Sequence, residues 1–467
     1  MKVWKQLGGV LITLLALTAM LTGTALAAES EVGISVQLNG EFIVFDDAVP
    51  EITNDRTFLP FRAVLEAIGA EVGYDAETST VSAKRDGVDM SMVLGQNTAA
   101  VTQDGQTRTV EMDVAAYVKN GRTYVPVRFV AEAFGCNVGW DANSRTVIIV
   151  DVETLLGGTT FDLMDNFAAY CAKQEKGQNM AVTGALNLEV ADKSGEYISK
   201  PITAKGTIDG ITSDTRAQLN WELKLSGLSE LAADSAGSPM EQVMLQAMLS
   251  ALSDMKGEVR MDLESGMLYL SLPAGLTGGT DDAWYSLDFA AYQAELLSGL
   301  NMAQLTQLEE DAGVREALAA VIQMMPLNDS QYSYAGVAQV AQVYVDMLSD
   351  QAFTQKGNTY VAQMKLEDMM PMTVTLTKRG DDIVSADISM DLDSSAFDAA
   401  LNPTEKMSMK LTEHAAPGKV TVDMDMAMED GDLSIKIGLD LSCVPTSKVP
   451  VTTLPAGVQA IPMETMY

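Results

Sequence analysis

Histidine, cysteine and basic side chains are scarce in this chain, and each scarcity excludes a class of function. Among 467 residues there are one His, three Cys and 30 Lys or Arg, against 64 Asp or Glu. The single imidazole, His414, cannot supply a metal centre built from several histidines. A formal net charge of −34 repels nucleic acid and anionic lipid. Hydrophobic residues still make up 47% of the chain, so a sizeable core is expected.

A long apolar run occurs only at the N terminus. Lys2 and Lys5 precede "LGGVLITLLALTAMLTG", and Ala25-Leu26-Ala27 has the small-x-small pattern of a cleavage site. Residues 1–27 therefore predict a secretory signal peptide. Cleavage would place Ala28 first, where a lipoprotein needs Cys. We expect a secreted or cell-envelope-associated acidic protein with no transmembrane segment once the signal is removed.

The cysteines are too few to form a disulfide framework. Cys136 lies in the second copy of a repeated segment described below, at the position equivalent to Ala70 in the first copy. This equivalence favours a small buried apolar residue. Cys171 and Cys443 are candidates to pair with each other, and the sequence leaves that pairing open.

One segment of the sequence occurs twice, with the second copy 66 positions after the first. "RTFLPFRAVLEAIGAEVGYD" begins at Arg56 and "RTYVPVRFVAEAFGCNVGWD" at Arg122. The two copies span about residues 36–85 and 101–150 within a predicted domain of residues 29–152. A short sheet-and-helix unit has little core of its own, so two copies are expected to share one. The positions that carry the repeat include Pro60, Arg62, Glu66, Gly69, Asp75, Pro126, Arg128, Glu132, Gly135, Trp140 and Asp141.

Each copy predicts a hairpin, a strand that enters a short helix, and a returning strand. Asn-Gly and Asp-Gly within alternating runs signal the hairpins. Pro60 and Pro126 suit the first turn of a helix, and Gly69 and Gly135 suit its C-cap.

Two residue pairs in the repeat have a possible catalytic interpretation. Arg62 with Glu66, and Arg128 with Glu132, are four residues apart and resemble an acid/base pair. The same spacing is that of an intrahelical ion pair, which we favour.

The aromatic residue before each Asp has two interpretations as well. Tyr74 and Trp140 could stack on carbohydrate, or they could pack on the helix of their own copy while Asp75 and Asp141 form turns. We favour the packing interpretation.

The repeated pattern resembles the copper amine oxidase N-terminal domain family, also called the stalk domain, over about residues 32–151. The resemblance implies an α+β module of antiparallel sheet and helix without catalytic activity and without metal. Copper amine oxidase activity also needs three His ligands, and this chain has His414 alone. We therefore expect a protein that is not an enzyme, with no cofactor and no metal site.

After a linker at residues 153–160, residues 161–467 predict a β-rich domain with inserted helices. Amphipathic segments occur at about 161–174, 239–254, 288–325 and 331–350. Long alternating runs surround them and predict one large antiparallel sheet with a polar and an apolar face, covered by helices. Together the two parts make an α+β protein.

Methionine is concentrated on the expected apolar face of this sheet. It either fills the space between sheet and helices or lines a lipid-sized pocket. A weak fold-level similarity to bacterial half-barrels that carry lipids or lipoproteins motivates the second interpretation. The candidate lining residues are Met372, Met390, Met424, Met426 and Met428.

Three classes of function follow from these observations. The favoured one is an exported non-catalytic protein whose β-rich domain binds an apolar, lipid-like ligand, an envelope polymer or a protein partner. The second is a purely structural surface protein, and the third a carboxylate-dependent cell-wall hydrolase. The string "DMDMAMEDGD" lacks the spacing of a calcium loop and fits a strand with its acids in water.

Overall fold

The computed structural model describes residues 33–463 in two compact units. The N-terminal unit comprises residues 33–159 and 312–345, and the sheet unit comprises residues 160–288 and 346–463. The sequence predicted one domain over 161–467, whereas the structure divides this range between the two units. Within 33–463 the description omits residues 47, 54–55, 104, 113, 128, 130–132, 176, 196–197, 199, 228–238, 274–282, 289–311, 326, 328–332, 367–369, 394–406 and 429–431.

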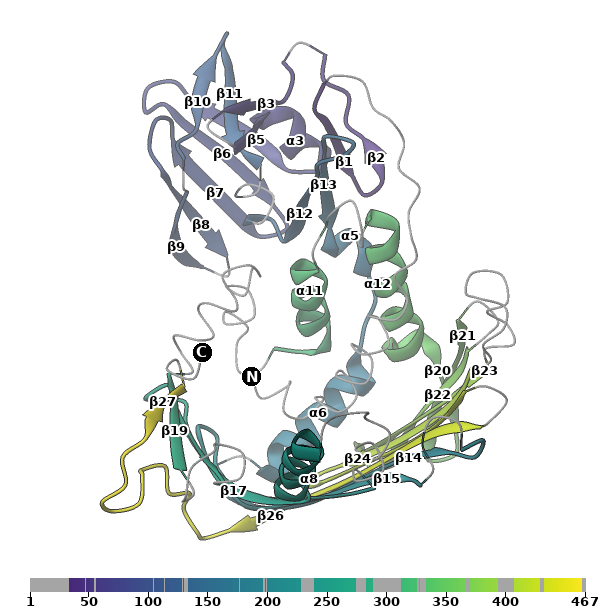
Figure 1. The fold of residues 1–467 in the computed structure, drawn as a ribbon. Coiled ribbons are helices and arrows are strands. Elements are labelled where there is room, and N and C mark those ends of the chain that lie inside the picture. The colour runs from purple at the N-terminus through teal and green to yellow at the C-terminus, as the bar shows by residue number, and fades with distance from the viewer. Residues whose placement is uncertain are drawn as a thin grey trace. The chain divides into compact units, whose positions relative to one another are not determined.

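The N-terminal unit contains three small sheets around one core (Figure 1). Their strand orders are β12-β13-β1-β2, β10-β11-β4-β3 and β5-β6-β7-β8-β9. The strands are β1 (Ser35–Leu38), β2 (Glu41–Phe42), β3 (Glu51–Thr53), β4 (Arg56–Pro60), β5 (Glu71–Asp75), β6 (Thr80–Arg85), β7 (Val88–Val93), β8 (Thr98–Gln103), β9 (Gln106–Glu111), β10 (Tyr117–Lys119), β11 (Arg122–Pro126), β12 (Cys136–Asp141) and β13 (Thr146–Asp151).

The two copies of the repeated sequence meet through equivalent strands. β4 and β11 are antiparallel, and Leu59 pairs with Val125, which lies 66 positions later. The helix of the first copy, α3 (Phe61–Ala67), begins directly after β4 and buries Phe61, Val64 and Leu65. This buried stripe packs into the core shared by both copies, because α3 alone is too short to be stable.

The hairpin signals in the sequence give tight turns. Asn39 and Gly40 join β1 to β2 with φ of 49° and 85°, as the Asn-Gly pair predicted. The ring of Tyr334 lies so close to Gly40 that any Cβ there would overlap it.

The returning strand of the second copy, β13, is buried on both faces, whereas the equivalent strand of the first copy, β6, is buried on one face. All six residues of β13 are buried, whereas β6 alternates between buried and exposed residues. Ile148 and Val150 occupy the positions that correspond to the exposed Ser82 and Lys84. A second hydrophobic cluster covers the extra apolar face of β13, and it consists of Ile148, Val150, Val152, Leu156, Ile322, Leu327, Val337 and Ala341.

One covering helix directly follows β13, and the other two come from a distant part of the chain. They are α5 (Val152–Leu156), α11 (Val314–Met324) and α12 (Tyr334–Leu348). Asn137 on β12 donates hydrogen bonds to the carbonyl oxygens of Ile322 (2.9 Å) and Met325 (2.7 Å), at the C-terminal end of α11. The carbonyl of Ile322 also accepts from the backbone N–H of Met325, so Asn137 adds a second bond there and supplies a donor to the carbonyl of Met325.

Gly139 allows this close approach, and we expect Gly139→Ala to destabilise the N-terminal unit by about 1–3 kcal/mol. A Cβ at position 139 would overlap the carbonyl oxygen and Cβ of Leu327, which are part of the chain beside α11. Gly73→Ala is the matched control, because the added Cβ would meet only the hydroxyl side chain of Ser82. Urea unfolding of both variants measures the difference, and equal midpoints would contradict the assigned role of Gly139.

The sheet unit is built on one 14-stranded sheet, antiparallel except at its last pair. The strand order is β20-β21-β22-β23-β24-β25-β26-β14-β15-β16-β17-β18-β19-β27. The strands are β14 (Asn179–Asp192), β15 (Ile202–Thr212), β16 (Arg216–Ser226), β17 (Asp254–Asp262), β18 (Met267–Leu272), β19 (Ala283–Asp288), β20 (Phe353–Lys356), β21 (Thr359–Leu366), β22 (Met370–Arg379), β23 (Asp382–Asp393), β24 (Met407–Ala416), β25 (Lys419–Met428), β26 (Leu433–Thr446) and β27 (Ile461–Pro462).

The strand register separates an apolar face from a polar face, as the alternating sequence predicted. One cross-strand row on the apolar face runs from β21 to β16 and consists of Met364, Met372, Met390, Leu411, Met424, Ile437, Leu188, Ala204 and Leu225. The neighbouring row on the polar face consists of Thr373, Ser389, Thr412, Asp423, Gly438, Asn187, Lys205 and Lys224.

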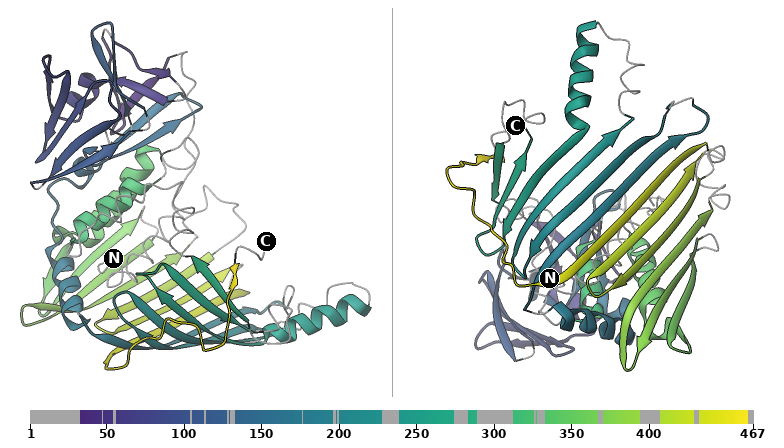
Figure 2. Two further views of the ribbon diagram at one scale, coloured as in Figure 1. Left: turned by 90° about the vertical axis from the view of Figure 1, so that its left-hand side faces the viewer. Right: turned by 90° about the horizontal axis from the view of Figure 1, so that it is seen from below.

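The sheet curves, and the helix α6 (Asp162–Glu175) lies on its concave side (Figure 1). The buried residues of α6 face the sheet, so the concave face is the apolar one. A second helix, α8 (Pro239–Leu252), extends beyond the strand ends (Figure 2). A one-turn helix, η2 (Asp350–Ala352), precedes β20.

The C-terminal segment crosses the polar face and ends beside β19 as β27 (Figure 2). The guanidinium of Arg260 donates to the carbonyl oxygen of Thr453 and lies 5.0 Å from the ring centroid of Trp284. The backbone N–H of Val451 donates to Oε1 of Gln218 over 3.0 Å. These contacts hold the segment across β16 and β17.

Candidate functional site

The repeated residues occupy structural positions in the N-terminal unit. Nε of Arg62 and Oε1 of Glu66 are 4.0 Å apart on α3, and both side chains are more than half exposed, as expected of a surface ion pair. Pro60 ends β4 and is the cap residue of α3, so it lies one position before the first turn in which the sequence placed it. Arg128 and Glu132 lie outside the described residues.

The remaining repeat positions form turns and strand ends. Gly69 and Gly135 have φ of 83° and 75°, which agrees with the predicted helix ends. Asp75 accepts hydrogen bonds from the hydroxyl of Thr78 and from the N–H of Glu77, and these bonds hold the pKa of its carboxyl below the ordinary value. The second copy has the corresponding turn: Pro126 ends β11, and Asp141 accepts from the backbone N–H groups of Asn143 and Ser144.

The two aromatic residues before these turns differ in their surroundings. Trp140 is partly buried and packs against the shared core. Tyr74 is 53% exposed, and its packing on the helix of its own copy stays a prediction.

The five candidate methionines all lie on the concave face but do not surround one cavity. Met372 and Met390 are buried and pair with each other across β22 and β23. Met424, Met426 and Met428 are half-buried along β25. None of the five lines the apolar cavity described below.

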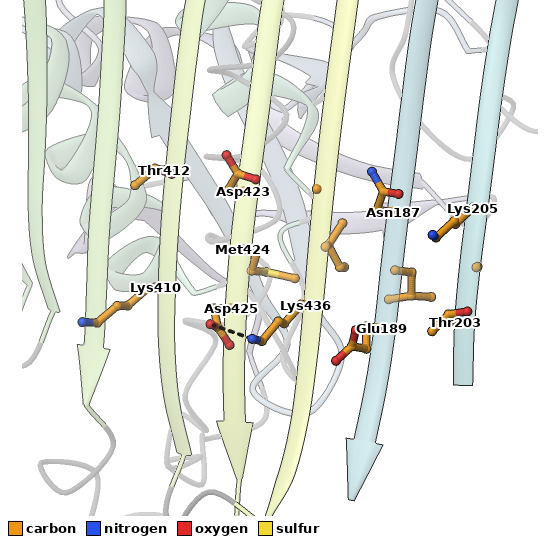
Figure 3. Close-up of a pocket in the computed structure, with 14 residues that line it drawn as sticks. Asn187, Glu189, Thr203, Lys205, Lys410, Thr412, Asp423, Met424, Asp425 and Lys436 are labelled. Atoms are coloured by element: carbon orange, nitrogen blue, oxygen red, sulfur yellow. Dashed lines mark ion pairs between the residues drawn. The ribbon is translucent and has the colours of Figure 1, made fainter. Parts of the chain in front are cut away.

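The polar face has a shallow hollow of about 450 Å³ (Figure 3). Charged side chains of both signs surround it, and Lys436 and Asp425 form an ion pair of 4.0 Å across β26 and β25. Hydroxyl and amide groups of Thr203, Thr412 and Asn187 lie between the charges. The hollow has the character of a solvated strand surface, because its charges lie on neighbouring strands and compensate one another.

The concave face has a cavity of about 390 Å³ beneath α6. This volume falls in the range of small-molecule sites. Two residues of α6 line the cavity, and the sheet supplies the rest from β14 to β17 and β24 to β26. The lining side chains that face inward are Phe167, Cys171, Met180, Val182, Thr212, Ala217, Leu219, Met261, Leu263, Ala415, Val420, Leu441 and Cys443.

Polar contacts at its first turn hold α6 over the cavity. Asp350, from the one-turn helix far along the chain, accepts from the backbone N–H groups of Asp162 and Leu163, both over 2.9 Å. Its carboxylate therefore satisfies orphan donors of α6 and complements the helix dipole. Asn166 bonds to the turn between β22 and β23, accepting from the N–H of Ile383 (2.6 Å) and donating to the carbonyl of Asp381 (3.2 Å).

Sequence reasoning missed the residues of this cavity. Cys171 on α6 and Cys443 on β26 are both thiols in the structure, and both line the cavity. The only feature of the sequence that pointed to this site was the possible pairing of Cys171 with Cys443. Glu413 was also missed: it is 2% exposed and lies on the apolar face between Ile388 and Val422, as the alternation in "MSMKLTEHAA" implies.

The three thiols should react with iodoacetamide in a fixed order in the native protein. Burial, reinforced by Asp151, raises the pKa of Cys136 to about 12, and the side chain is fully buried, so its thiolate is scarce at neutral pH. Cys443 is half-buried and should react first, and Cys171 second. Peptide mass spectrometry over time measures the order, and early labelling of Cys136 would contradict it.

The described residues contain no metal-binding cluster of three or more His, Cys, Asp or Glu. None of the helices that the structure describes has both the length and the apolar character needed to cross a bilayer. The arrangement beneath α6 is suited to holding an apolar group away from water, because apolar cavities exclude ordered water.

Comparison with known proteins gives a family match to part of the chain and distant matches among solved structures. The copper amine oxidase N-terminal domain family matches residues 37–149. No curated protein matches the chain. The crystal structure of MucB in complex with MucA(peri) aligns with 61% of this chain and 93% of that chain, at 9% identity and a TM-score of 0.08, and this likeness supports no conclusion. The chain thus carries, at residues 37–149, a match to the stalk-domain family that its repeated sequence resembles.

Proposed function

We propose that this protein is an exported, non-catalytic component of the cell envelope that binds an apolar ligand beneath α6. The cavity on the concave face carries the proposal, since its volume of about 390 Å³ and its largely apolar lining are typical of small-molecule sites. The stalk-domain match at residues 37–149 supports a spacing or anchoring role for the N-terminal unit. The sequence of residues 1–27 supports export.

The N-terminal unit is, in this proposal, a duplicated module. The pairing of Leu59 with Val125, and of Pro60 and Phe58 with Tyr124 and Pro126, supports an approximate two-fold relation between the copies. The second copy then diverged at Ile148 and Val150, where apolar side chains accept α11 and α12.

Ligand binding is tested with the mature protein by native mass spectrometry after gentle extraction, and by displacement of a neutral fluorescent hydrophobic probe. A bound hydrophobic compound, together with displacement by added amphiphiles, supports the proposal. The absence of both would favour a purely structural protein.

A pair of variants on one strand locates the binding. Leu219 and Leu225 lie on the same face of β16, and only Leu219 lines the cavity. Leu219→Trp should fill the cavity and weaken probe binding about tenfold or more, whereas Leu225→Trp should leave it unchanged. Equal effects of the two substitutions would place the binding elsewhere.

Export has a separate test. Expression of the full chain in a bacterial host should release a mature protein from the cytoplasm, and N-terminal mass spectrometry should find cleavage after Ala27. A protein that keeps residues 1–27 and stays in the cytoplasmic fraction would contradict export, and this result would not affect the ligand proposal.

A further inference from the structure

We propose that the cavity beneath α6 holds its ligand as a single extended hydrocarbon chain that lies across the strands, and that it discriminates against compact apolar molecules. This inference rests on the proposed ligand-binding function and names the class of ligand. The strand register along the floor of the cavity carries it.

The floor of the cavity is much longer than it is wide. Its side chains come from seven neighbouring strands, in the order β24-β25-β26-β14-β15-β16-β17. Strands lie about 4.8 Å apart, so the six intervals between them span roughly 29 Å. Each strand supplies only one or two side chains that face inward, and two such positions on one strand are only about 7 Å apart.

Cross-strand pairing joins the floor residues of β17, β16, β15 and β14 into one row. Met261 on β17 pairs with Ala217 on β16, and Ala217 pairs with Thr212 on β15. Thr212 in turn pairs with Met180 on β14. All four residues line the cavity, so this half of the floor is continuous from strand to strand.

The row continues on the other side of β14 after a step of one inward position. Val182, two residues after Met180, pairs with Cys443 on β26. Leu441, two residues before Cys443, pairs with Val420 on β25, which pairs with Ala415 on β24. These residues line the cavity as well. The floor is therefore one narrow band that crosses the strands obliquely.

The helix above keeps this band narrow. Phe167 and Cys171 lie one turn apart on α6, so they share a face of the helix, and both are buried and line the cavity. The contacts of Asp350 and Asn166 fix α6 in place. A thick ligand would have to displace the ring of Phe167, whereas a single chain can lie along the band and contact apolar side chains on every strand.

The first test compares three competitors with one uncharged glycerol head group, so that charge plays no part. They are monostearoylglycerol, monooctanoylglycerol and the glycerol ester of adamantanecarboxylic acid, and each displaces the neutral fluorescent probe from the mature protein. A buried methylene contributes about fourfold in affinity, so the stearoyl compound should bind more than a hundredfold more tightly than the octanoyl compound. The adamantane cage has more carbon atoms than the octanoyl chain but is compact, and its ester should bind at least tenfold more weakly than monooctanoylglycerol.

The outcomes separate this inference from the proposed function. Equal or tighter binding of the adamantane ester than of monooctanoylglycerol would overturn the inference alone. Failure of all three compounds to displace the probe would overturn the proposed function as well.

Substitutions at the two ends of the floor test whether one chain reaches both. Met261 on β17 and Val420 on β25 are half-buried, and the five strand intervals between them span about 24 Å. An extended stearoyl chain has a comparable length. Met261→Trp and Val420→Trp should each weaken binding of monostearoylglycerol about tenfold, whereas monooctanoylglycerol can use the part left open and should lose less than about threefold.

The same strand offers a matched control for these variants. Val422 lies two residues beyond Val420 on the same face of β25 and does not line the cavity, so Val422→Trp should change neither affinity. Met261→Phe and Val420→Phe replace any Trp variant that lacks the native unfolding transition. Weaker stearoyl binding in only one of the two end variants would show that the ligand occupies one part of the floor, and would overturn the extended chain.

Discussion

Replacing Arg85 by Ala is expected to lower the free energy of unfolding of the N-terminal unit by about 3–5 kcal/mol. Nη2 of Arg85, at the end of β6, lies 2.7 Å from Oδ2 of Asp151, at the end of β13, and the two side chains are only 12% and 4% exposed. The substitution would leave the Asp151 carboxylate buried without its counter-ion. Urea unfolding of the purified protein measures the loss.

Two variants distinguish this buried pair from an ordinary surface pair. Lys84→Ala removes the neighbouring ion pair with Asp89, which is more than half exposed, and should cost less than about 1 kcal/mol. Arg85→Met combined with Asp151→Asn removes both charges, and Asn can still cap α5, where Asp151 accepts from the N–H and hydroxyl of Thr154. The double variant should be more stable than Arg85→Ala. If it is not, the burial of an unpaired charge is not the cause of the loss.

Phe167→Ala should destabilise the sheet unit by about 3–5 kcal/mol, because a fully buried aromatic ring is lost. The ring lies on α6 and forms part of the roof of the concave-face cavity. Scanning calorimetry should show a lowered transition for the sheet unit, with the transition of the N-terminal unit unchanged.

The same helix offers the control for this change. Lys173→Ala alters an exposed residue of α6 and should change stability by less than about 0.5 kcal/mol. Because Phe167→Ala enlarges the cavity, the variant should also accept a bulkier amphiphile than the native protein. A variant with native stability would show that α6 does not pack on the sheet as described.

Much of the fold followed from local patterns in the sequence. The helices α6, α8 and α12 lie within the predicted amphipathic segments, and the turns at Ser265-Gly266 and Arg379-Gly380 join the predicted strands. Alternation also assigned the faces of the large sheet, since a strand directs successive side chains to opposite sides.

The candidate site could not be found in the same way. The five methionines were chosen for their residue type and for the alternation along their strands. These features identify the apolar face of the sheet, but they do not show where side chains leave a cavity on it. The cavity instead arises where small residues such as Ala217 and Ala415 come to lie beneath α6. Their strands are far apart in sequence, so no local pattern marks the place.

The sequence by itself determined the repeat, the type of each element and the polarity of each strand face, because backbone geometry and side-chain period act over a few residues. Only the tertiary structure decided that α11 covers the second copy, that Asp350 caps α6 and that Arg85 meets Asp151. These contacts join residues widely separated in the chain, and they form only where complementary surfaces and charges meet in the folded protein.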